Sequence, residues 1–158
     1  MSLFSYPEES DGPPGPAEPP RFIFLHNLAS AGWKKILAHC ETLQFWAGDT
    51  LLYAGDTDDA FYILTAGTVE VVLPQQNNAG PALTEIPEGS VFGELSFFDG
   101  QPRSASIRAR SDGNAIRISR ANFDHLSGWD PVLGRQILLD LGRIMSLRLR
   151  WTTELSQR

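Results

Sequence analysis

The sequence has one cysteine, three histidines and no long apolar run. The single Cys40 cannot form an internal disulfide, and no CxxC pair is present for zinc or redox chemistry. No hydrophobic run approaches the roughly 20 residues that cross a bilayer, and no basic stretch followed by an apolar one marks a signal peptide. These absences predict a cytoplasmic protein without a membrane segment.

The sequence also lacks the motifs and the charge that are typical of metal-binding, catalytic and nucleic-acid-binding proteins. The histidines His26, His39 and His125 form no HxH or HxxxH pair, which disfavours a small β-barrel metalloenzyme. No nucleophile elbow or Walker lysine is present, so we expect neither an enzyme nor a bound cofactor. The formal net charge of −6 lacks the basic footprint of a nucleic-acid binder and predicts no direct DNA binding.

The first 20 residues differ in composition from the rest. They hold six of the eleven prolines and four acids, with no lysine or arginine. Such a composition is typical of a disordered tail. Residues 21–158 are then enough for one domain with a hydrophobic core.

Residues 21–158 predict a β-sandwich or barrel flanked by helices. A helix with Ser30 as its N-cap runs to about Cys40. Short β-type runs follow, separated by turn residues: 43–47, 51–54, 60–64, 68–73, 82–86, 105–109 and 114–119, with a turn over 77–81. A short helix covers about 120–126, and Asp130-Pro131 opens a long amphipathic helix over 131–156 as its N-cap and first residue.

Residues 92–107, FGELSFFDGQPRSASI, place one acid and one arginine in an apolar frame. Arg103 offers a planar fork of donors suited to a phosphate, and the small Ser104 and Ala105 let backbone amides approach the same group. Gly93 permits a turn that exposes N–H groups, while Glu94 accepts hydrogen bonds and suits a hydroxyl donor. A ribose 3′,5′-cyclic phosphate carries both partners. A structural Glu94–Arg103 salt bridge is the alternative.

This segment resembles the phosphate-binding cassette of the cyclic-nucleotide-binding domain family, of the catabolite activator and kinase A regulatory subunit type. The match covers residues 92–95 and 100–105 without a gap, and it extends to Phe45, Gly48, Gly55-Asp56, Tyr62, Gly67 and Val69. The resemblance implies a mainly β fold, a β-roll (double-stranded β-helix or jelly-roll) with a short cassette helix. It also implies a non-catalytic sensor. Glu94 and the Gly93 amide would hold the ribose 2′-hydroxyl, Leu95 would be a further ligand-binding residue, and Arg103, Ser104 and Ala105 would hold the cyclic phosphate.

The long C-terminal helix carries two apolar stripes, which predict two partners, the barrel and another helix. The first stripe is Leu133, Ile137, Leu141, Ile144, Trp151 and Leu155, and the second is Leu138, Met145 and Leu149. The stretch from Met145 resembles the dimer helix of the catabolite activator. The resemblance implies a homodimer in which Thr152 and Thr153 reach the adenine, one from each subunit. Alternatively, both threonines are simply exposed near the helix end.

Two further features bear on which nucleotide binds and on how the bound state would be signalled. Ser104 follows the cassette arginine, where kinase A type sites have alanine and cGMP-preferring sites often have threonine. The catabolite activator also has serine there, so the resemblance favours cAMP and leaves cGMP open. The sequence has no helix-turn-helix. We therefore expect a sensor that signals by movement of its last helix to a dimer mate or to an unidentified protein effector. The alternative is a ligand-independent protein–protein interaction module that retains the fold.

Overall fold

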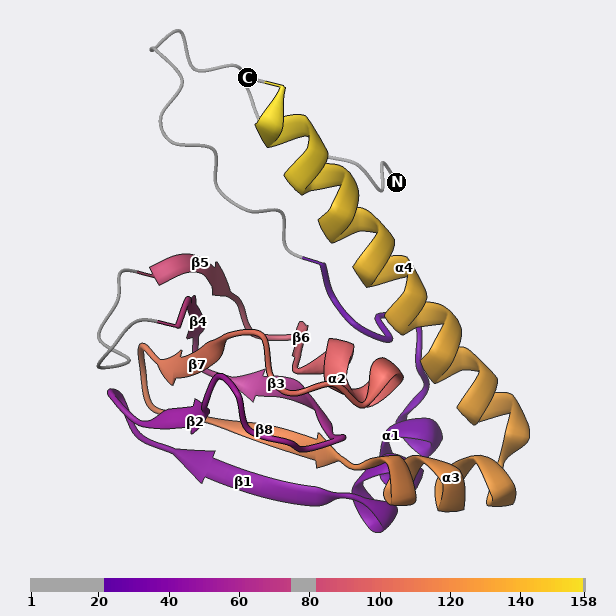
Figure 1. Cartoon of the computed structure of the whole chain (residues 1–158). Helices are drawn as coiled ribbons and strands as arrows, with labels where there is room; N and C mark the ends of the chain where they lie inside the picture. Colours follow the sequence, from indigo (N-terminus) through magenta and orange to yellow (C-terminus); the bar gives the residue numbers. More distant parts are fainter. Residues whose placement is uncertain (1–21, 75–81, 158) are drawn as a thin grey trace, which may run out of the picture.

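The computed structural model describes residues 22–74 and 82–157. The predicted disordered tail and the predicted turn over 77–81 lie outside the described residues. In the described part, strands fill the middle of the chain and helices lie at both ends (Figure 1). In chain order the elements are α1 (Ser30–His39), β1 (Glu41–Phe45), β2 (Thr50–Leu52), β3 (Phe61–Ala66), β4 (Val69–Val72), β5 (Ala82–Ile86), β6 (Val91–Phe92), α2 (Glu94–Asp99), β7 (Ser106–Ala109), β8 (Gly113–Ile118), α3 (Arg120–Trp129) and α4 (Pro131–Ser156).

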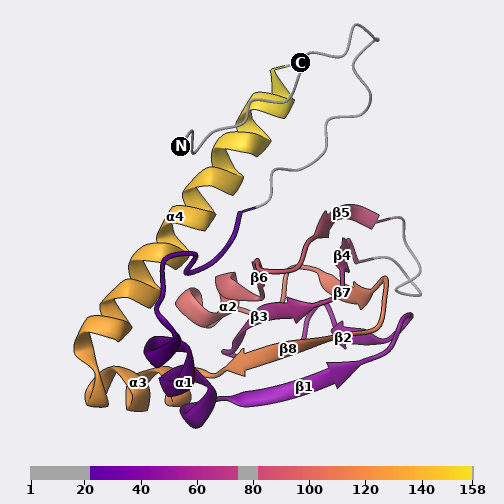
Figure 2. The same ribbon diagram turned by 180° about the vertical axis from the view of Figure 1, so that it is seen from behind.

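The strands form two antiparallel sheets, which confirms the predicted β-roll. One sheet has the order β1-β8-β3-β6 and the other β2-β7-β4-β5. Most neighbouring strands come from distant parts of the chain, as when β2 pairs with β7, whereas β4 and β5 are consecutive strands that pair with each other. Seen from both sides, α1 and α3 lie together beyond one end of the sheets, and α4 rises past them (Figures 1 and 2).

Two hydrophobic cores follow from the alternation of side chains along the strands. One lies inside the roll and includes Phe45, Leu64 and Val69. The other joins the strands to the helices through Phe61, Ile116 and Ile118. The first apolar stripe of α4 enters this second core through its N-terminal members, Leu133, Ile137, Leu141 and Ile144. Trp151 is half-buried and Leu155 is 43% exposed.

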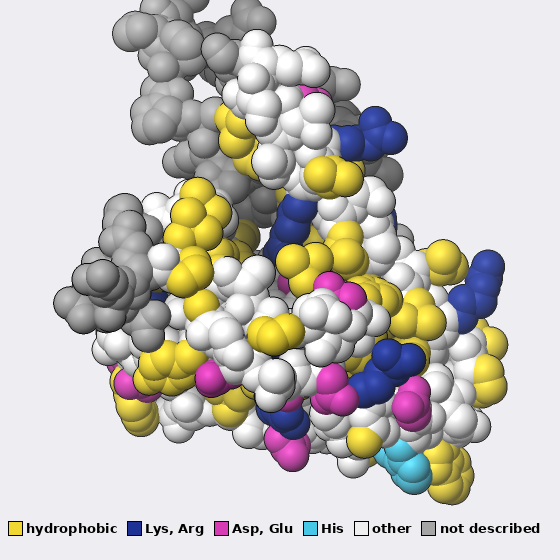
Figure 3. All heavy atoms as spheres, in the orientation of Figure 1, with side chains coloured by type: hydrophobic (Ala, Val, Ile, Leu, Met, Phe, Trp, Pro, Cys, Tyr) yellow, Lys and Arg dark blue, Asp and Glu magenta, His cyan; other side chains and the backbone are white. Residues whose placement is uncertain are grey.

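The C-terminal half of α4 extends beyond the strands (Figures 1 and 2). The second apolar stripe of α4, which begins in its N-terminal half, is largely open to solvent, because Leu138 is 40% and Leu149 is 68% exposed. Figure 3 shows further hydrophobic side chains at the surface toward the end where α3 meets α4, where Trp129 is 75% exposed. Within the described residues, no helix is long and apolar enough to cross a membrane.

Helix and strand boundaries differ from the predictions at several places. Ser30 is not the N-cap of α1, because Ala29 has the extended backbone and its carbonyl accepts the first helical bond, from Trp33 N at 3.3 Å. The helix predicted to end near residue 126 continues to Trp129, and Ser119 and Asn122 form a capping box at its start. The strand predicted over 43–47 ends at Phe45, and the exposed Trp46 begins a turn instead.

The opening of the long helix confirms its prediction. Asp130 is the N-cap, and its side chain accepts a hydrogen bond from Leu133 N at 3.0 Å. Pro131 is the first helical residue, where its missing N–H costs no helical bond. The helix ends at Ser156, as predicted.

Candidate functional site

Arg103 is the most deeply buried charged residue of the predicted set, with 5% of its surface exposed. Its Nη1 donates to Gly93 O at 2.7 Å, and its Nη2 donates to Ala60 O at 2.7 Å and to Asp58 Oδ2 at 3.1 Å. Its buried Nε finds no hydrogen-bond partner among the described residues. A buried donor of a permanently charged group is costly to leave unpaired, so Nε marks a place where an acceptor would be stabilised.

Gly93 is required by this geometry in two ways. It adopts a φ of +78°, which L side chains rarely take. A Cβ at this position would also lie 2.9 Å from Arg103 Nη1 and 3.2 Å from Ala60 O. The glycine therefore lets the guanidinium approach the backbone just before α2 begins.

Asp58 belongs to the site although the sequence analysis did not select it. Its Oδ1 accepts from Arg117 Nη2 at 2.8 Å while its Oδ2 accepts from Arg103, and Tyr62 OH lies 3.3 Å from Oδ2. Burial opposes the charge on Asp58, but the Arg117 and Arg103 guanidiniums outweigh burial and hold its pKa below the usual range. No spacing rule connects an acid in a turn with an arginine 45 residues later, so the sequence offered no signal for this contact.

A hollow of about 280 Å³ opens beside this network. Arg103 lines it, whereas Glu94, Ser104 and Ala105 do not. Its other lining residues are Leu51, Leu52, Tyr53, Asp56, Thr57, Asp58 and Tyr62. Arg103 therefore borders a hollow whose volume is close to the lower end of the range for small-ligand pockets.

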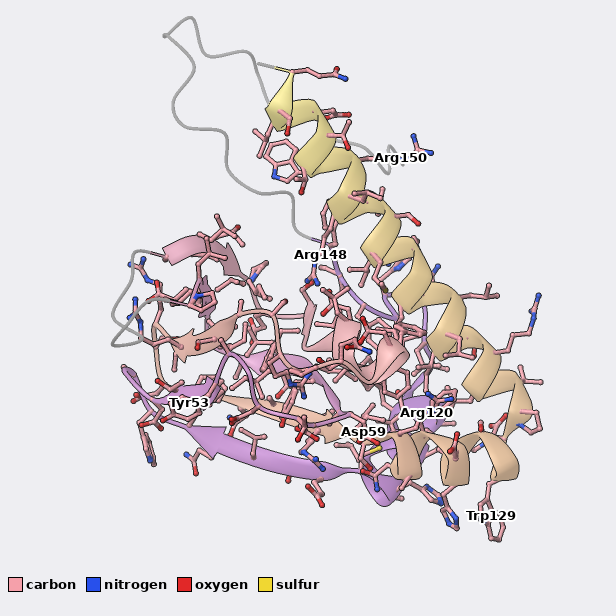
Figure 4. The ribbon with its side chains drawn as sticks, in the orientation of Figure 1. Tyr53, Asp59, Arg120, Trp129, Arg148 and Arg150 are labelled. Atoms are coloured by element: carbon pink, nitrogen blue, oxygen red, sulfur yellow. The ribbon has the colours of Figure 1, made fainter. Side chains whose placement is uncertain are left out.

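Glu94 is paired with the C-terminal helix, not with Arg103. Arg148 Nη1 donates to Glu94 Oε1 at 2.7 Å, and Nη2 donates to Val91 O at 2.6 Å and to Ser90 Oγ at 3.0 Å. Figure 4 shows Arg148 pointing from α4 toward the roll. The alternative of a Glu94–Arg103 salt bridge is therefore wrong, because each residue finds its counter-charge on a different element.

Arg148 joins the site through a feature that the sequence did contain. It occupies a position on the first apolar stripe, between Ile144 and Trp151, where a charged side chain is out of place. The side chain keeps 27% exposure, and that of Glu94 keeps 11%. A charge on the packed face of a helix needs a partner in the surface it meets, and Glu94 supplies it.

The remaining predicted residues lie at the edges of this arrangement. Leu95 is 49% exposed on α2, Ser104 is exposed and Ala105 half-buried in the bend before β7. Thr152 and Thr153 are exposed on the last turns of α4, and their hydroxyls donate to the carbonyls of Arg148 and Leu149. The structure thus brings the cassette residues close to one another and leaves the two threonines at a separate place on α4.

Comparison with known families agrees with this architecture. Residues 42–127, just over half of the 158 residues, match the family described as cyclic nucleotide-binding domain. The chain therefore belongs to the cyclic nucleotide-binding domain family, which confirms the resemblance found in residues 92–107.

Two curated relatives are regulators. The chain is 34% identical over 123 residues to the cAMP-activated global transcriptional regulator Vfr of Pseudomonas aeruginosa, covering 75% of this chain and 56% of that protein. It is 33% identical over 94 residues to a cAMP-dependent protein kinase regulatory subunit of Emericella nidulans, covering 60% of this chain and 22% of that protein. The chain therefore spans about half the length of the first relative and less of the second.

Solved structures share the fold. The catabolite activator protein of Thermus thermophilus matches with a TM-score of 0.70 and 26% identity, covering 84% of this chain and 61% of that one. A cyclic nucleotide-binding domain from Methylobacillus flagellatus matches with a TM-score of 0.75 and 24% identity, covering 87% of this chain and 78% of that one. At this identity the second match speaks for the fold alone.

Proposed function

We propose that this chain is a non-catalytic sensor that binds a 3′,5′-cyclic nucleotide, with the cyclic phosphate at Arg103. The observation that carries the proposal is the buried guanidinium set beside Gly93, whose Nε has no hydrogen-bond partner in the part of the chain that the structure describes. Gly93 O, Ala60 O and Asp58 hold the two terminal nitrogens, so the guanidinium is oriented before any ligand arrives. A preoriented arginine loses little side-chain freedom on binding an anion. Ser104 and Ala105 follow directly and would bring their backbone amides to the same phosphate.

Glu94 is the proposed partner of the ribose 2′-hydroxyl, with Gly93 and Leu95 beside it. Arg148 occupies the Oε1 atom of Glu94, and a ligand hydroxyl would donate to Oε2. The carboxylate is then shared between ligand and helix α4. This sharing gives a physical route from the ligand to the last helix.

We favour cAMP over cGMP as the ligand. Both curated relatives described above carry cAMP in their names, and Ser104 is compatible with either base. Thr152 and Thr153 remain the proposed contacts to the base, with one of them reaching the ligand of a second subunit. Their hydroxyl protons are donated within α4, so each oxygen would act as an acceptor in this state.

The proposed output is a change in the position of α4. Ligand at Glu94 alters the Arg148 contact, and α4 then presents its second apolar stripe differently to a dimer mate or to a protein effector. The exposure of Leu138 and Leu149 supports a helix-helix contact there. The free energy available for this change is the difference in ligand affinity between the two positions of the helix.

Substitution of Arg103 tests the proposed function. Arg103→Ala should lose about 1.5–3 kcal/mol of cyclic-nucleotide binding, the range for a hydrogen bond to a charged group, or roughly 10- to 150-fold in affinity. Arg150→Ala removes an exposed arginine from α4 and should bind as the wild type does. Equal affinity in the Arg103 and Arg150 variants, measured by titration calorimetry on nucleotide-free protein, would refute the assignment.

The proposed homodimer has its own test. Leu149→Asp places a charge on the second apolar stripe, at a side chain that is 68% exposed and not needed by the core of the single chain. The variant should sediment as a monomer at concentrations where the wild type is dimeric. A wild type that stays monomeric at high concentration, with and without nucleotide, would contradict the proposal.

A further inference from the structure

The fold brings together two histidines that are 86 residues apart in the sequence. His39 is the last residue of α1 and His125 lies in α3, and their ring centroids are 5.4 Å apart with an interplanar angle of 46°. His39 is half-buried and His125 is exposed, so the pair is open to solvent. Neither ring takes part in the proposed nucleotide site.

We propose that His39 and His125 form a two-histidine binding site for a divalent transition metal such as Zn²⁺ or Cu²⁺. Imidazole nitrogens are preferred ligands of these ions. With a metal–nitrogen bond of about 2.0–2.1 Å and a ring centre about 1.1 Å behind each nitrogen, two rings at a tetrahedral angle have centroids about 5 Å apart. The observed centroid separation of 5.4 Å is close to this value.

The hydrogen bond of His39 prepares one ring for this role. Its Nδ1 lies 2.8 Å from Lys35 O, and a carbonyl oxygen can only accept, so Nδ1 carries the proton and donates it. The lone pair of the neutral ring is therefore on Nε2. Metal-binding histidines characteristically donate their other N–H to a carbonyl or carboxylate in this way.

The surrounding charges are compatible with a bound cation. The Lys35 ammonium is held by Asp130 Oδ2 at 2.6 Å, which neutralises a nearby positive charge. Asp124 precedes His125 in the chain, its side chain is 66% exposed, and its Oδ1 lies 3.6 Å from Arg120 Nε, so that arginine is also paired with an acid. Across residues 22–74 and 82–157 there is no cluster of three or more metal-ligating side chains. The two rings thus supply two ligands, and water completes the coordination.

A bound ion would link the end of α1 to α3. Because α3 leads directly into α4, the ion would stabilise the N-terminal end of α4. The contact of α4 with Glu94 is made by Arg148, which lies in the other half of the helix. The histidine pair is separate from the nucleotide site, so metal binding does not require nucleotide binding.

The neighbouring Trp129 provides a direct readout. Its ring centroid lies 6.3 Å from that of His125, and the side chain is 75% exposed. Cu²⁺ bound at the histidines would quench the fluorescence of Trp129. The chain has three other tryptophans, so a Trp129→Phe variant shows how much of the quenching comes from Trp129. The titration is carried out with CuCl₂ on the full chain.

His39→Gln and His125→Gln should each weaken Cu²⁺ binding at least about tenfold, the scale known for loss of a supporting group at a metal site. His26→Gln is the matched control, because His26 lies in the segment before α1, and it should bind Cu²⁺ as the wild type does. Zn²⁺ titration by calorimetry repeats the comparison without fluorescence, and circular dichroism verifies that each variant is folded. Wild-type affinity in either the His39 or the His125 variant, or an equal loss in the His26 variant, would overturn the proposal.

Discussion

Replacing Arg148 by alanine should destabilise the chain markedly, because it leaves the Glu94 carboxylate buried without its counter-charge. Glu94 is 9% exposed, and Arg148 also donates to Val91 O and Ser90 Oγ. Breaking one partner of a buried ion pair costs about 3–5 kcal/mol. The 27% exposure of the Arg148 side chain lets water replace part of the interaction, so we expect about 2–3 kcal/mol for Arg148→Ala.

A double-mutant cycle measures this coupling. The free energies of unfolding of Arg148→Ala, Glu94→Gln and the double variant come from urea denaturation at neutral pH. The two sites should couple by about 1–3 kcal/mol, and the exposed Arg150→Ala should change stability by no more than about 0.5 kcal/mol. Additive effects within about 0.5 kcal/mol, or an Arg148 variant as harmless as the Arg150 variant, would refute the contact between α4 and the cassette.

Two further substitutions test the network around Arg103. The low pKa of Asp58 means that its contribution to stability is full above the ordinary carboxyl pKa near 3.9 and is lost as pH falls through the lower folded value. Asp58→Asn should therefore unfold with less dependence on pH below about 4 than the wild type, and identical pH profiles of urea unfolding would contradict this. Gly93→Ala meets a φ of +78° and a contact of 2.9 Å with Arg103, whereas Gly100→Ala meets a φ of +66° and open space. Gly100→Ala should lower the free energy of unfolding by about 1–2 kcal/mol through the backbone alone. Gly93→Ala should lower it further and also weaken cyclic-nucleotide binding. Equal destabilisation of the two variants in thermal denaturation would contradict the close approach of Arg103 to Gly93.

The general architecture could be predicted because local signals agree along the chain. Alternation within short strands, glycine turns and the Asp130-Pro131 helix start all depend on neighbouring residues, and each appears in the structure. The two-residue β6 was missed because Val91 and Phe92 are too few to show a period. The N-cap of α1 was misplaced by one residue, because serine is a common cap, whereas the exposed Ala29 takes that position in the extended conformation.

The sequence identified residues of the site more readily than it predicted which of them contact one another. Residues 92–107 identified the arginine and the acid, since glycines and small residues near them mark a close approach of backbone to ligand. Their partners Asp58 and Arg148 come from a distant turn and from the last helix. Only the folded roll brings these charges together, so composition and spacing suggested an ion pair between Glu94 and Arg103 that does not form.

The most direct test of the proposed sensor is titration calorimetry of the nucleotide-free protein with cAMP and then with cGMP. We predict binding in the micromolar range or tighter, stronger for cAMP, and lost by at least tenfold in Arg103→Ala. The absence of binding to either nucleotide by the folded wild type would contradict the account, and the chain would then be a protein–protein interaction module that retains the fold of its family.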